Sequence, residues 1–227
     1  MPEKSLPEWE RLMEAAARLQ RIVPGSVLVG GTAAASHVHH RLSFDADHAV
    51  GDLRGRFDEI LAQLESVAGW KTARVRRPVL ILGSLDGIET GVRQLIRETP
   101  LETERISVGN EEVVVPTLPE MLRIKGVLIL KRNATRDYLD FAAMARQLGP
   151  DGVAAALSSF DSLYPQPNGQ SALQQLLVQL ANPMPFDLDD TDLSDYKRLV
   201  PEWRDWMAVA AACADAASTI LATAKRT

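Results

Sequence analysis

The fold of this chain is decided by one stretch, which reads Val27-Leu-Val-Gly-Gly-Thr-Ala-Ala-Ala-Ser-His-Val-His-His-Arg-Leu-Ser-Phe-Asp-Ala-Asp-His-Ala-Val50. It begins with an apolar run typical of a buried strand, followed by a glycine pair and an alanine-rich segment. It ends in two carboxylates that are two residues apart. This order predicts a strand over residues 26–31, a helix over residues 32–40 and a second strand over residues 42–47.

The carboxylates Asp45 and Asp47 are the first candidate functional residues. Residues i and i+2 of a strand project from the same face, so Ser43, Asp45 and Asp47 are expected side by side. Paired carboxylates can hold Mg²⁺ or Mn²⁺, which also binds the phosphate oxygens of a substrate. Asp-x-Asp is nevertheless frequent by chance, and by itself it equally describes a solvated strand edge.

The glycine pair gives the carboxylates a more specific context. Gly30 and Gly31 let the backbone approach a ligand closely because they carry no side chain. A helix that starts near Thr32 also favours an anion at its N-terminus. Together with the carboxylates, these residues predict a metal-dependent site for a nucleoside triphosphate.

The rest of the chain divides into an α/β half and a helical half. Before residue 116, the pattern predicts helices over residues 7–23 and 52–67, and strands over residues 71–77, 79–83, 88–95, 104–108 and 112–115. After it, only helices are predicted, near residues 119–131, 136–148, 152–163, 171–180 and 201–224. We therefore expect an α/β (α+β) fold, with a small mixed sheet and its helices in residues 1–116 and an all-helical domain in residues 117–227.

Composition narrows the setting of the protein. The lone cysteine, Cys213, excludes an internal disulfide and fits a reducing cytoplasm. The first 21 residues carry eight charged side chains, unlike a signal peptide, and the longest apolar run, residues 206–214, is too short to cross a bilayer. A cytoplasmic protein without membrane contact is expected. The net charge of −5 argues against a general nucleic-acid coat protein, although residues 71–77 and 121–136 are locally basic.

A second group of charged residues follows the α/β half. Lys125, Arg132 and Arg136 are spaced i, i+7 and i+11, so on one continuous helix they would share a face. If that face met the carboxylate strand, Lys125 would neutralise triphosphate charge. A solvated helix surface accounts for the same spacing.

The two groups together resemble the nucleotidyltransferase superfamily and, within it, the AbiEii-type toxins of bacterial toxin–antitoxin and abortive-infection systems. The first block is Gly30-Gly31-Thr32-Ala33, His37 and Arg41-Leu42-Ser43-Phe44-Asp45-Ala46-Asp47. The second is Leu118-Pro119-Glu120-Met121-Leu122, Lys125, Arg132 and Arg136-Asp137-Tyr138-Leu139-Asp140-Phe141. Two ordered blocks, which span residues 27–145, are more specific than either alone.

The resemblance implies transfer of a nucleoside monophosphate from a triphosphate to an acceptor, with an RNA such as tRNA as acceptor and a cognate antitoxin as partner. Asp45 and Asp47 would hold the metal, and Glu89 is the best match to a third carboxylate, followed by Asp86. The triphosphate would be bound by Gly30, Gly31, Thr32 and Ser43. Lys125 would supply charge, and Asp137 would orient the acceptor or act as a base.

Two alternatives stay open at this point. One is a catalytically inactive member of the fold that serves as a binding module, which the unclear third carboxylate favours. The other is a transferase acting on a small molecule such as an aminoglycoside, which the acidic net charge would suit.

The remaining polar clusters have simpler interpretations. His37, His39 and His40 lack the further ligands of a zinc site. We expect His37 to pack or hydrogen-bond near the carboxylate strand, and His39 and His40 to lie at the end of a helix. His48 alternates with the carboxylates and is expected to face the core. The acidic run in residues 187–195 lacks the pattern of a calcium loop and predicts an exposed connection.

Overall fold

A computed structural model describes residues 7–224, so that the first six residues of the charged N-terminal segment lie outside the described residues. The chain forms two compact units. The α/β unit comprises residues 1–33 and 43–117, and the helical unit comprises residues 34–42 and 118–227. The chain crosses from the α/β unit to the helical unit for the last time after Thr117. The segment Ala34–Leu42 also belongs to the helical unit, which the sequence pattern did not indicate.

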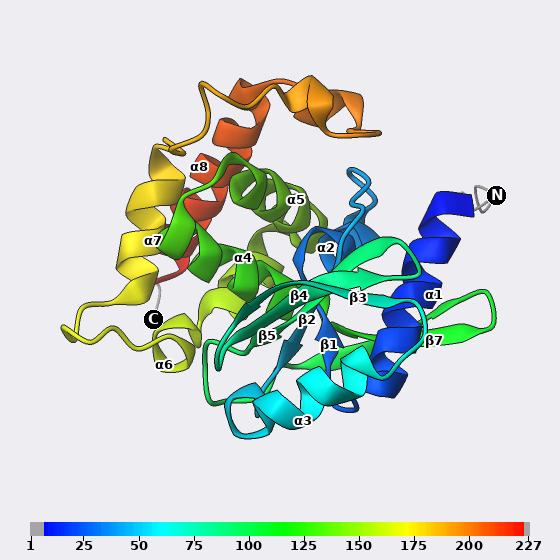
Figure 1. The fold of residues 1–227 in the computed structure, drawn as a ribbon. Coiled ribbons are helices and arrows are strands. Elements are labelled where there is room, and N and C mark those ends of the chain that lie inside the picture. The colour runs from blue at the N-terminus through cyan, green and yellow to red at the C-terminus, as the bar shows by residue number, and fades with distance from the viewer. Residues whose placement is uncertain (1–6, 225–227) are drawn as a thin grey trace. The chain divides into compact units, whose positions relative to one another are not determined.

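The α/β unit contains two helices and seven strands in its described residues (Figure 1). These are α1 (Pro7–Ile22), β1 (Val27–Leu28), β2 (Ala46–Val50), α3 (Leu53–Glu65), β3 (Trp70–Arg76), β4 (Leu80–Leu85), β5 (Ile88–Gln94), β6 (Thr103–Val108) and β7 (Glu111–Pro116). A further helix, α2 (Gly30–Val38), begins in this unit and ends in the other.

The main sheet is mixed, as predicted, and has the strand order β1-β2-β5-β4-β3. Strands β2 and β5 are parallel, whereas the other neighbouring pairs are antiparallel. Strands β6 and β7 form a separate hairpin around the predicted turn at Gly109. The parallel pair at the centre brings together two strands that are far apart in sequence, and β2 carries Asp47.

One face of this sheet forms the core of the α/β unit. Val50, Ile81 and Val92 project from neighbouring strands and pack with Leu53 and Phe57 at the start of α3. Leu19 of α1 and Val23, which directly follows this helix, complete the same cluster. Because side chains alternate along a strand, the opposite face carries Asp47 on β2 and the odd-numbered residues of β5.

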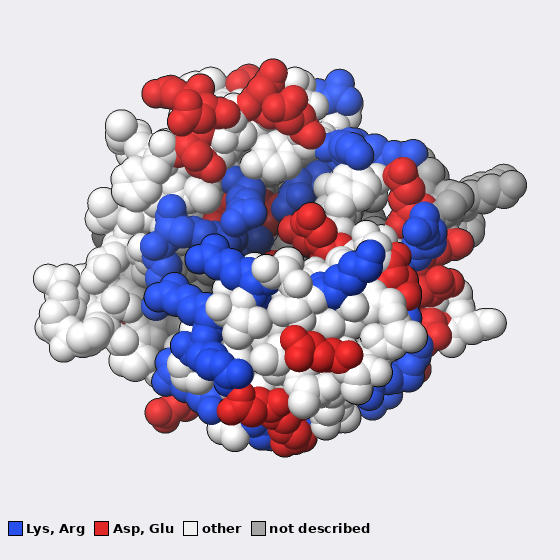
Figure 2. All heavy atoms as spheres, viewed as in Figure 1, with Lys and Arg blue, Asp and Glu red and all other residues white. Residues whose placement is uncertain are grey.

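The helical unit contains α4 (Leu118–Arg132), α5 (Thr135–Leu157), α6 (Phe160–Leu163), α7 (Ala172–Ala181) and α8 (Trp206–Ala224), with two short 3₁₀ turns between α7 and α8. Helix α5 merges two predicted helices across a break at Gly149, where the backbone φ is +69°. The acidic side chains of the connection from Asp189 to Asp195 are exposed as predicted, whereas Asp187 is half-buried. Figure 2 shows acidic side chains gathered over the segment coloured orange in Figure 1. Asp187 of this connection accepts a hydrogen bond from the backbone N–H of Thr135 at 2.7 Å, which satisfies the first N–H of α5.

The apolar run at residue 206 was predicted from sequence to be too short to cross a bilayer, and the structure corrects the length of that segment. Within the described residues, one helical segment, Trp206–Thr223, is long and apolar enough to cross a bilayer by length and composition alone. Here α8 packs against α5 and α7, and it carries the exposed carboxylate Asp215, which is costly to place in lipid.

Candidate active site

Two carboxylates share the open face of the parallel strand pair. Asp47 lies beside Gly91 in the register of β2 and β5, so Glu89 and Arg93 project from the same face. Glu89 is exposed and Asp47 is half-buried. The strand that the sequence suggested for a third carboxylate is therefore the direct neighbour of the strand that carries Asp47.

Asp45 occupies a different position from the predicted one. Strand β2 begins at Ala46, so Asp45 and Ser43 lie in the irregular segment before it. The strict alternation predicted for residues 42–47 therefore fails, and with it the argument that Ser43, Asp45 and Asp47 share a strand face. Asp45 is exposed, whereas Ser43 is buried.

Hydrogen bonds fix the backbone that carries the carboxylates. The hydroxyl of Thr32 donates to the carbonyl of Asp45 at 2.6 Å, and the N–H of Val29 donates to the carbonyl of Asp47 at 2.8 Å. The side chain of Thr32 is fully buried. It therefore positions Asp45 through the backbone, and the predicted role of Thr32 in holding a triphosphate stays a prediction.

The glycine pair begins α2 directly beside Asp47. Gly30 has a φ of +79°, a conformation that favours glycine. A methyl group at this position would lie 3.6 Å from Cβ and 3.8 Å from Oδ2 of Asp47. The helix starts earlier than predicted, at Gly30 rather than Thr32, and its first residue lies next to the Asp47 carboxylate.

Arg93 is a cation at this site that the sequence pattern did not indicate. Its guanidinium Nη2 lies 3.3 Å from both carboxylate oxygens of Asp47. No local pattern links the two residues, because the contact follows from the β2–β5 register. Among residues 7–224 there is no group of three or more histidine, cysteine or acidic side chains placed to hold a metal, so the carboxylates offer at most a partial ligand set.

Lys125 and Asp137 lie in the helical unit, where they belong to a buried cluster of ion pairs. The ammonium of Lys125 is 3.2 Å from Asp137 and 2.6 Å from Asp140. The guanidinium of Arg132 also binds Asp137, and that of Arg41 binds both oxygens of Asp140 at 2.8 and 3.0 Å. Both carboxylates are fully buried, and only 1% of the Lys125 side chain is exposed.

The charges of this cluster compensate for the cost of burial. Burial would raise the pKa of Asp140, but Arg41, Lys125 and the hydrogen bond from His40 hold it well below its ordinary value. Burial likewise opposes ionisation of Asp137, whose pKa is lowered by Lys125 and Arg132. Both carboxylates are therefore ionised and fully committed to internal partners.

Arg41 and His40 join the two sequence blocks inside the helical unit. Nε2 of His40 lies 2.7 Å from Asp140, and Arg41 binds the same carboxylate. Arg136 does not continue the row of cations from Lys125, because α4 ends at Arg132 and Arg136 is exposed on the next helix. This corrects the prediction that three cations share one helix face.

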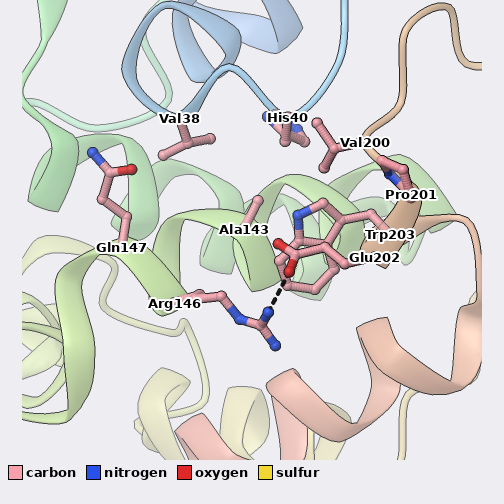
Figure 3. A pocket seen from close by; sticks show the side chains of 9 residues that line it. All are labelled: Val38, His40, Ala143, Arg146, Gln147, Val200, Pro201, Glu202 and Trp203. Carbon is pink, nitrogen blue, oxygen red and sulfur yellow. Dashed lines mark hydrogen bonds and ion pairs between the residues drawn. The ribbon is translucent and has the colours of Figure 1, made fainter.

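A cavity of about 440 Å³ in the helical unit opens beside His40 (Figure 3). An ion pair at 2.6 Å between Arg146 and Glu202 lies at its wall, and Trp203 stacks against Arg146. None of the residues predicted for transfer lines the cavity. It is therefore a feature of the helical unit that is separate from the carboxylates of the candidate site.

Solved structures share this fold. A nucleotidyltransferase-like protein of H. pylori aligns over 99% of this chain and 98% of its own with a TM-score of 0.53 and 14% identity. JHP933 from Helicobacter pylori aligns over 96% and 92% with a TM-score of 0.50 and 15% identity. The antibiotic-resistance factor ANT(2″)-Ia, solved with adenylyl-2″-tobramycin, aligns over 68% of this chain and 98% of its own, with a TM-score of 0.51 and 14% identity. The chain therefore has a nucleotidyltransferase-like fold.

Sequence comparison gives a different and shorter match, and no protein-family model matches the chain. The heme uptake protein MmpL11 of Mycobacterium tuberculosis (strain ATCC 25618 / H37Rv) is 38% identical over 97 residues, which cover 41% of this chain and 10% of that protein. The mycolic acid-containing lipids exporter MmpL11 of Mycolicibacterium smegmatis is 32% identical over 132 residues, or 57% and 13%. The match spans about a tenth of the length of these curated relatives, so the activities named for them are not carried over.

Proposed function

We propose that this protein is a nucleotidyltransferase that moves a nucleoside monophosphate from a nucleoside triphosphate to an acceptor hydroxyl. The observation that carries the proposal is the placement of Asp47 and Glu89 on one open face of adjacent parallel strands, with the N-terminus of α2 beside Asp47. The nucleotidyltransferase-like fold supports it.

The carboxylates fit a divalent metal by the chemistry of their donors. Mg²⁺ or Mn²⁺ takes oxygen ligands and completes its shell with water and phosphate oxygens, so it does not need a full set of protein ligands. Asp45 and Asp47 would hold it, with Glu89 as the third carboxylate. When bound, the metal supplies positive charge to the phosphates of the substrate.

The remaining groups of the α/β unit would bind and orient the triphosphate. The first N–H groups of α2, at Gly30 and Gly31, favour a phosphate because the helix dipole adds to their hydrogen bonds. Arg93 adds a cation on the same face. In the reaction the acceptor oxygen bonds to the α-phosphorus and gives up its proton to solvent, while the bond from that phosphorus to the bridging oxygen breaks. Pyrophosphate then leaves with the electron pair.

The contacts of Lys125 and Asp137 favour a positioning role over direct contact with the substrate. Both would have to break buried ion pairs before Lys125 could meet a triphosphate or Asp137 could accept a proton. Asp137 is also a weak base, since its pKa is lowered by Lys125 and Arg132. The cluster is instead suited to hold α4, α5 and the segment at Arg41 in a fixed arrangement.

The finer function follows from the resemblance in sequence. It is that of a cytoplasmic toxin of a toxin–antitoxin system, which modifies an RNA such as tRNA and is controlled by a cognate antitoxin. The second candidate, transfer to a small molecule, is favoured by the likeness to ANT(2″)-Ia. An inactive binding member is favoured by the absence of a three-carboxylate group among residues 7–224.

Incubation with each labelled nucleoside triphosphate, Mg²⁺ or Mn²⁺, and either total RNA or a set of aminoglycosides separates these candidates. Label on RNA that is lost in Asp45→Asn supports the proposal in its finer form. Asp52→Asn is the matched control, because Asp52 is an exposed carboxylate of the same unit whose ion-pair partner among residues 7–224 is the surface residue Arg56. Label on the aminoglycosides alone would favour the small-molecule enzyme, and no transfer to either acceptor would leave the binding member.

A further inference from the structure

The open face of the main sheet is strongly basic on the side away from the carboxylates. Strand β3 pairs with β4 so that Lys71 lies opposite Ser84, Arg74 opposite Leu82 and Arg76 opposite Leu80. The residue pairing continues from β4 to β5 and from β5 to β2, and it places all three cations on the face of the sheet that carries Asp47. An irregularity between Thr72 and Arg74 restores this alternation, since Lys71 and Arg74 would otherwise face opposite sides.

The three cations are exposed and available to a ligand. Every residue of β3 after Trp70 is exposed. Within residues 7–224, none of Lys71, Arg74 and Arg76 forms an ion pair, in contrast to most other arginines of this unit. Strands β3 and β4 contain no acidic residue, so nothing on these strands neutralises the charge.

The position of the cations relative to the carboxylates fits an extended polyanion. Three strand spacings separate β3 from β2, which is about 14 Å. The face between them offers Leu80, Leu82 and Ser84 and no aromatic side chain, because Trp70 is turned to the core. A ligand would therefore be held through its charge and not through stacking of bases.

We propose that this basic face, defined by Lys71, Arg74 and Arg76, binds the phosphate backbone of an RNA acceptor whose terminal hydroxyl reaches the carboxylates. The proposal rests on the proposed nucleotidyl transfer to RNA and assigns the surface that holds this acceptor. A polycationic aminoglycoside would be repelled by this face, which distinguishes the protein from an enzyme that uses such acceptors. The occupant is RNA because RNA is the acceptor of the proposed function.

The test compares two triple variants of the full chain with equal loss of charge. Lys71→Thr, Arg74→Thr and Arg76→Thr remove the basic face and keep residues that favour a strand. Arg11→Gln, Arg21→Gln and Arg54→Gln remove three exposed arginines from α1 and α3, the helices that pack on the other face of the sheet. Binding of a labelled folded RNA with a free 3′ end is measured by fluorescence anisotropy over a range of salt concentrations, without nucleotide.

The basic-face variant is expected to bind RNA roughly tenfold more weakly, and the slope of log affinity against log salt should fall by about 2, as loss of three phosphate contacts requires. The control should retain most of its affinity. Equal weakening of both variants, no weakening of the first, or binding of duplex DNA in preference to RNA would overturn the proposal.

A separate titration with Mn²⁺ and nucleotide distinguishes this inference from the proposed function. Both triple variants should bind the nucleotide like the wild type. If the wild type transfers no label but binds RNA more tightly than the basic-face variant does, the transfer proposal fails while the surface is supported. If transfer occurs to RNA and is equally fast in the basic-face variant at limiting RNA, the surface is overturned while the transfer proposal holds.

Discussion

The open carboxylates Asp45, Asp47 and Glu89 and the buried cluster of the helical unit use the same kinds of residue in opposite ways. Of the open carboxylates, Asp45 and Glu89 are exposed, and Asp47 has one arginine at the limit of hydrogen-bond distance. In the cluster, Asp137 and Asp140 are fully buried and each has at least two cationic partners. Carboxylates with spare capacity can bind a ligand, whereas carboxylates that are already satisfied hold the structure. The comparison therefore separates the candidate site from a cluster that stabilises the helical unit, although the sequence motifs treat both as one site.

The largest expected difference concerns transfer activity. Asp47→Asn removes a carboxylate from the open face while it leaves the core untouched, so transfer should fall about 10³-fold, or about 4 kcal/mol in the barrier. The free energy of unfolding should change by less than about 1 kcal/mol. Rates with labelled nucleoside triphosphate and urea unfolding curves check the two parts. A fall of about 4 kcal/mol in the free energy of unfolding would show that Asp47 is structural. The contrast between the open and the buried carboxylates would then be lost.

The converse effect is expected in the cluster. Asp140→Asn leaves Arg41 and Lys125 buried beside a neutral amide, and loss of one partner from a buried ion pair costs about 3–5 kcal/mol of unfolding free energy. Urea unfolding measures it, with Asp52→Asn as the exposed control, whose effect should stay below about 1 kcal/mol. A cost for Asp140→Asn no larger than that of the control would mean that the cluster does not support the fold.

Acid should distinguish the two units. Burial lowers the pKa of His48 to about 4, although its hydrogen bond to the carbonyl of Ala46 opposes the shift. The unfolded chain takes up this proton near pH 6.5 and the folded chain only near pH 4. Stability is therefore lost as the pH falls through this window, by at most about 3 kcal/mol.

The buried carboxylates respond in another range. The pKa values of Asp137 and Asp140 are lowered, so the stability that they contribute is lost only below their ordinary value of 3.8. Urea unfolding at a series of pH values should show the wild type losing unfolding free energy as the pH falls from 6.5 to 4. The His48→Asn variant should lose less over the same range. An unchanged pH dependence in that variant would exclude His48 as its source.

The smallest effect is expected at the rim of the cluster. The side chain of Arg132 is 35% exposed, and Asp137 keeps its contact with Lys125 when Arg132 is replaced. Arg132→Gln should therefore cost only about 1 kcal/mol of unfolding free energy. Thermal unfolding checks this value, and a cost as large as that of Asp140→Asn would show that the rim and the centre of the cluster are equivalent.

Much of the fold could be predicted from sequence because its signals are local. The alternation of apolar residues and the Gly109 turn located the strands after Trp70, and the spacing of apolar residues located the helices. The start of β2 could not be found in this way, since Leu42–Asp45 alternates like a strand and yet is irregular. Its backbone bonds to distant residues instead, as where the N–H of Leu42 donates to the carbonyl of Lys197.

The candidate site was predicted in its residue types but not in its contacts. Glu89 was named from its flanking residues, and the β2–β5 register places it beside the predicted strand. Arg93 against Asp47 and Arg41 against Asp140 were missed, because these pairs are 46 and 99 residues apart. Only the tertiary structure shows that Asp137 and Lys125 neutralise each other, so their predicted roles in transfer were assigned from the motif alone.

The central claim is that the open carboxylates, and not the buried ones, hold the metal and the nucleotide. Titration of Mn²⁺ in the presence of a non-hydrolysable nucleoside triphosphate, followed by electron paramagnetic resonance, tests it most directly. We expect Asp47→Asn to weaken Mn²⁺ binding by roughly tenfold or more with an unchanged unfolding midpoint, while Asp52→Asn binds like the wild type. Wild-type affinity in Asp47→Asn would contradict the claim.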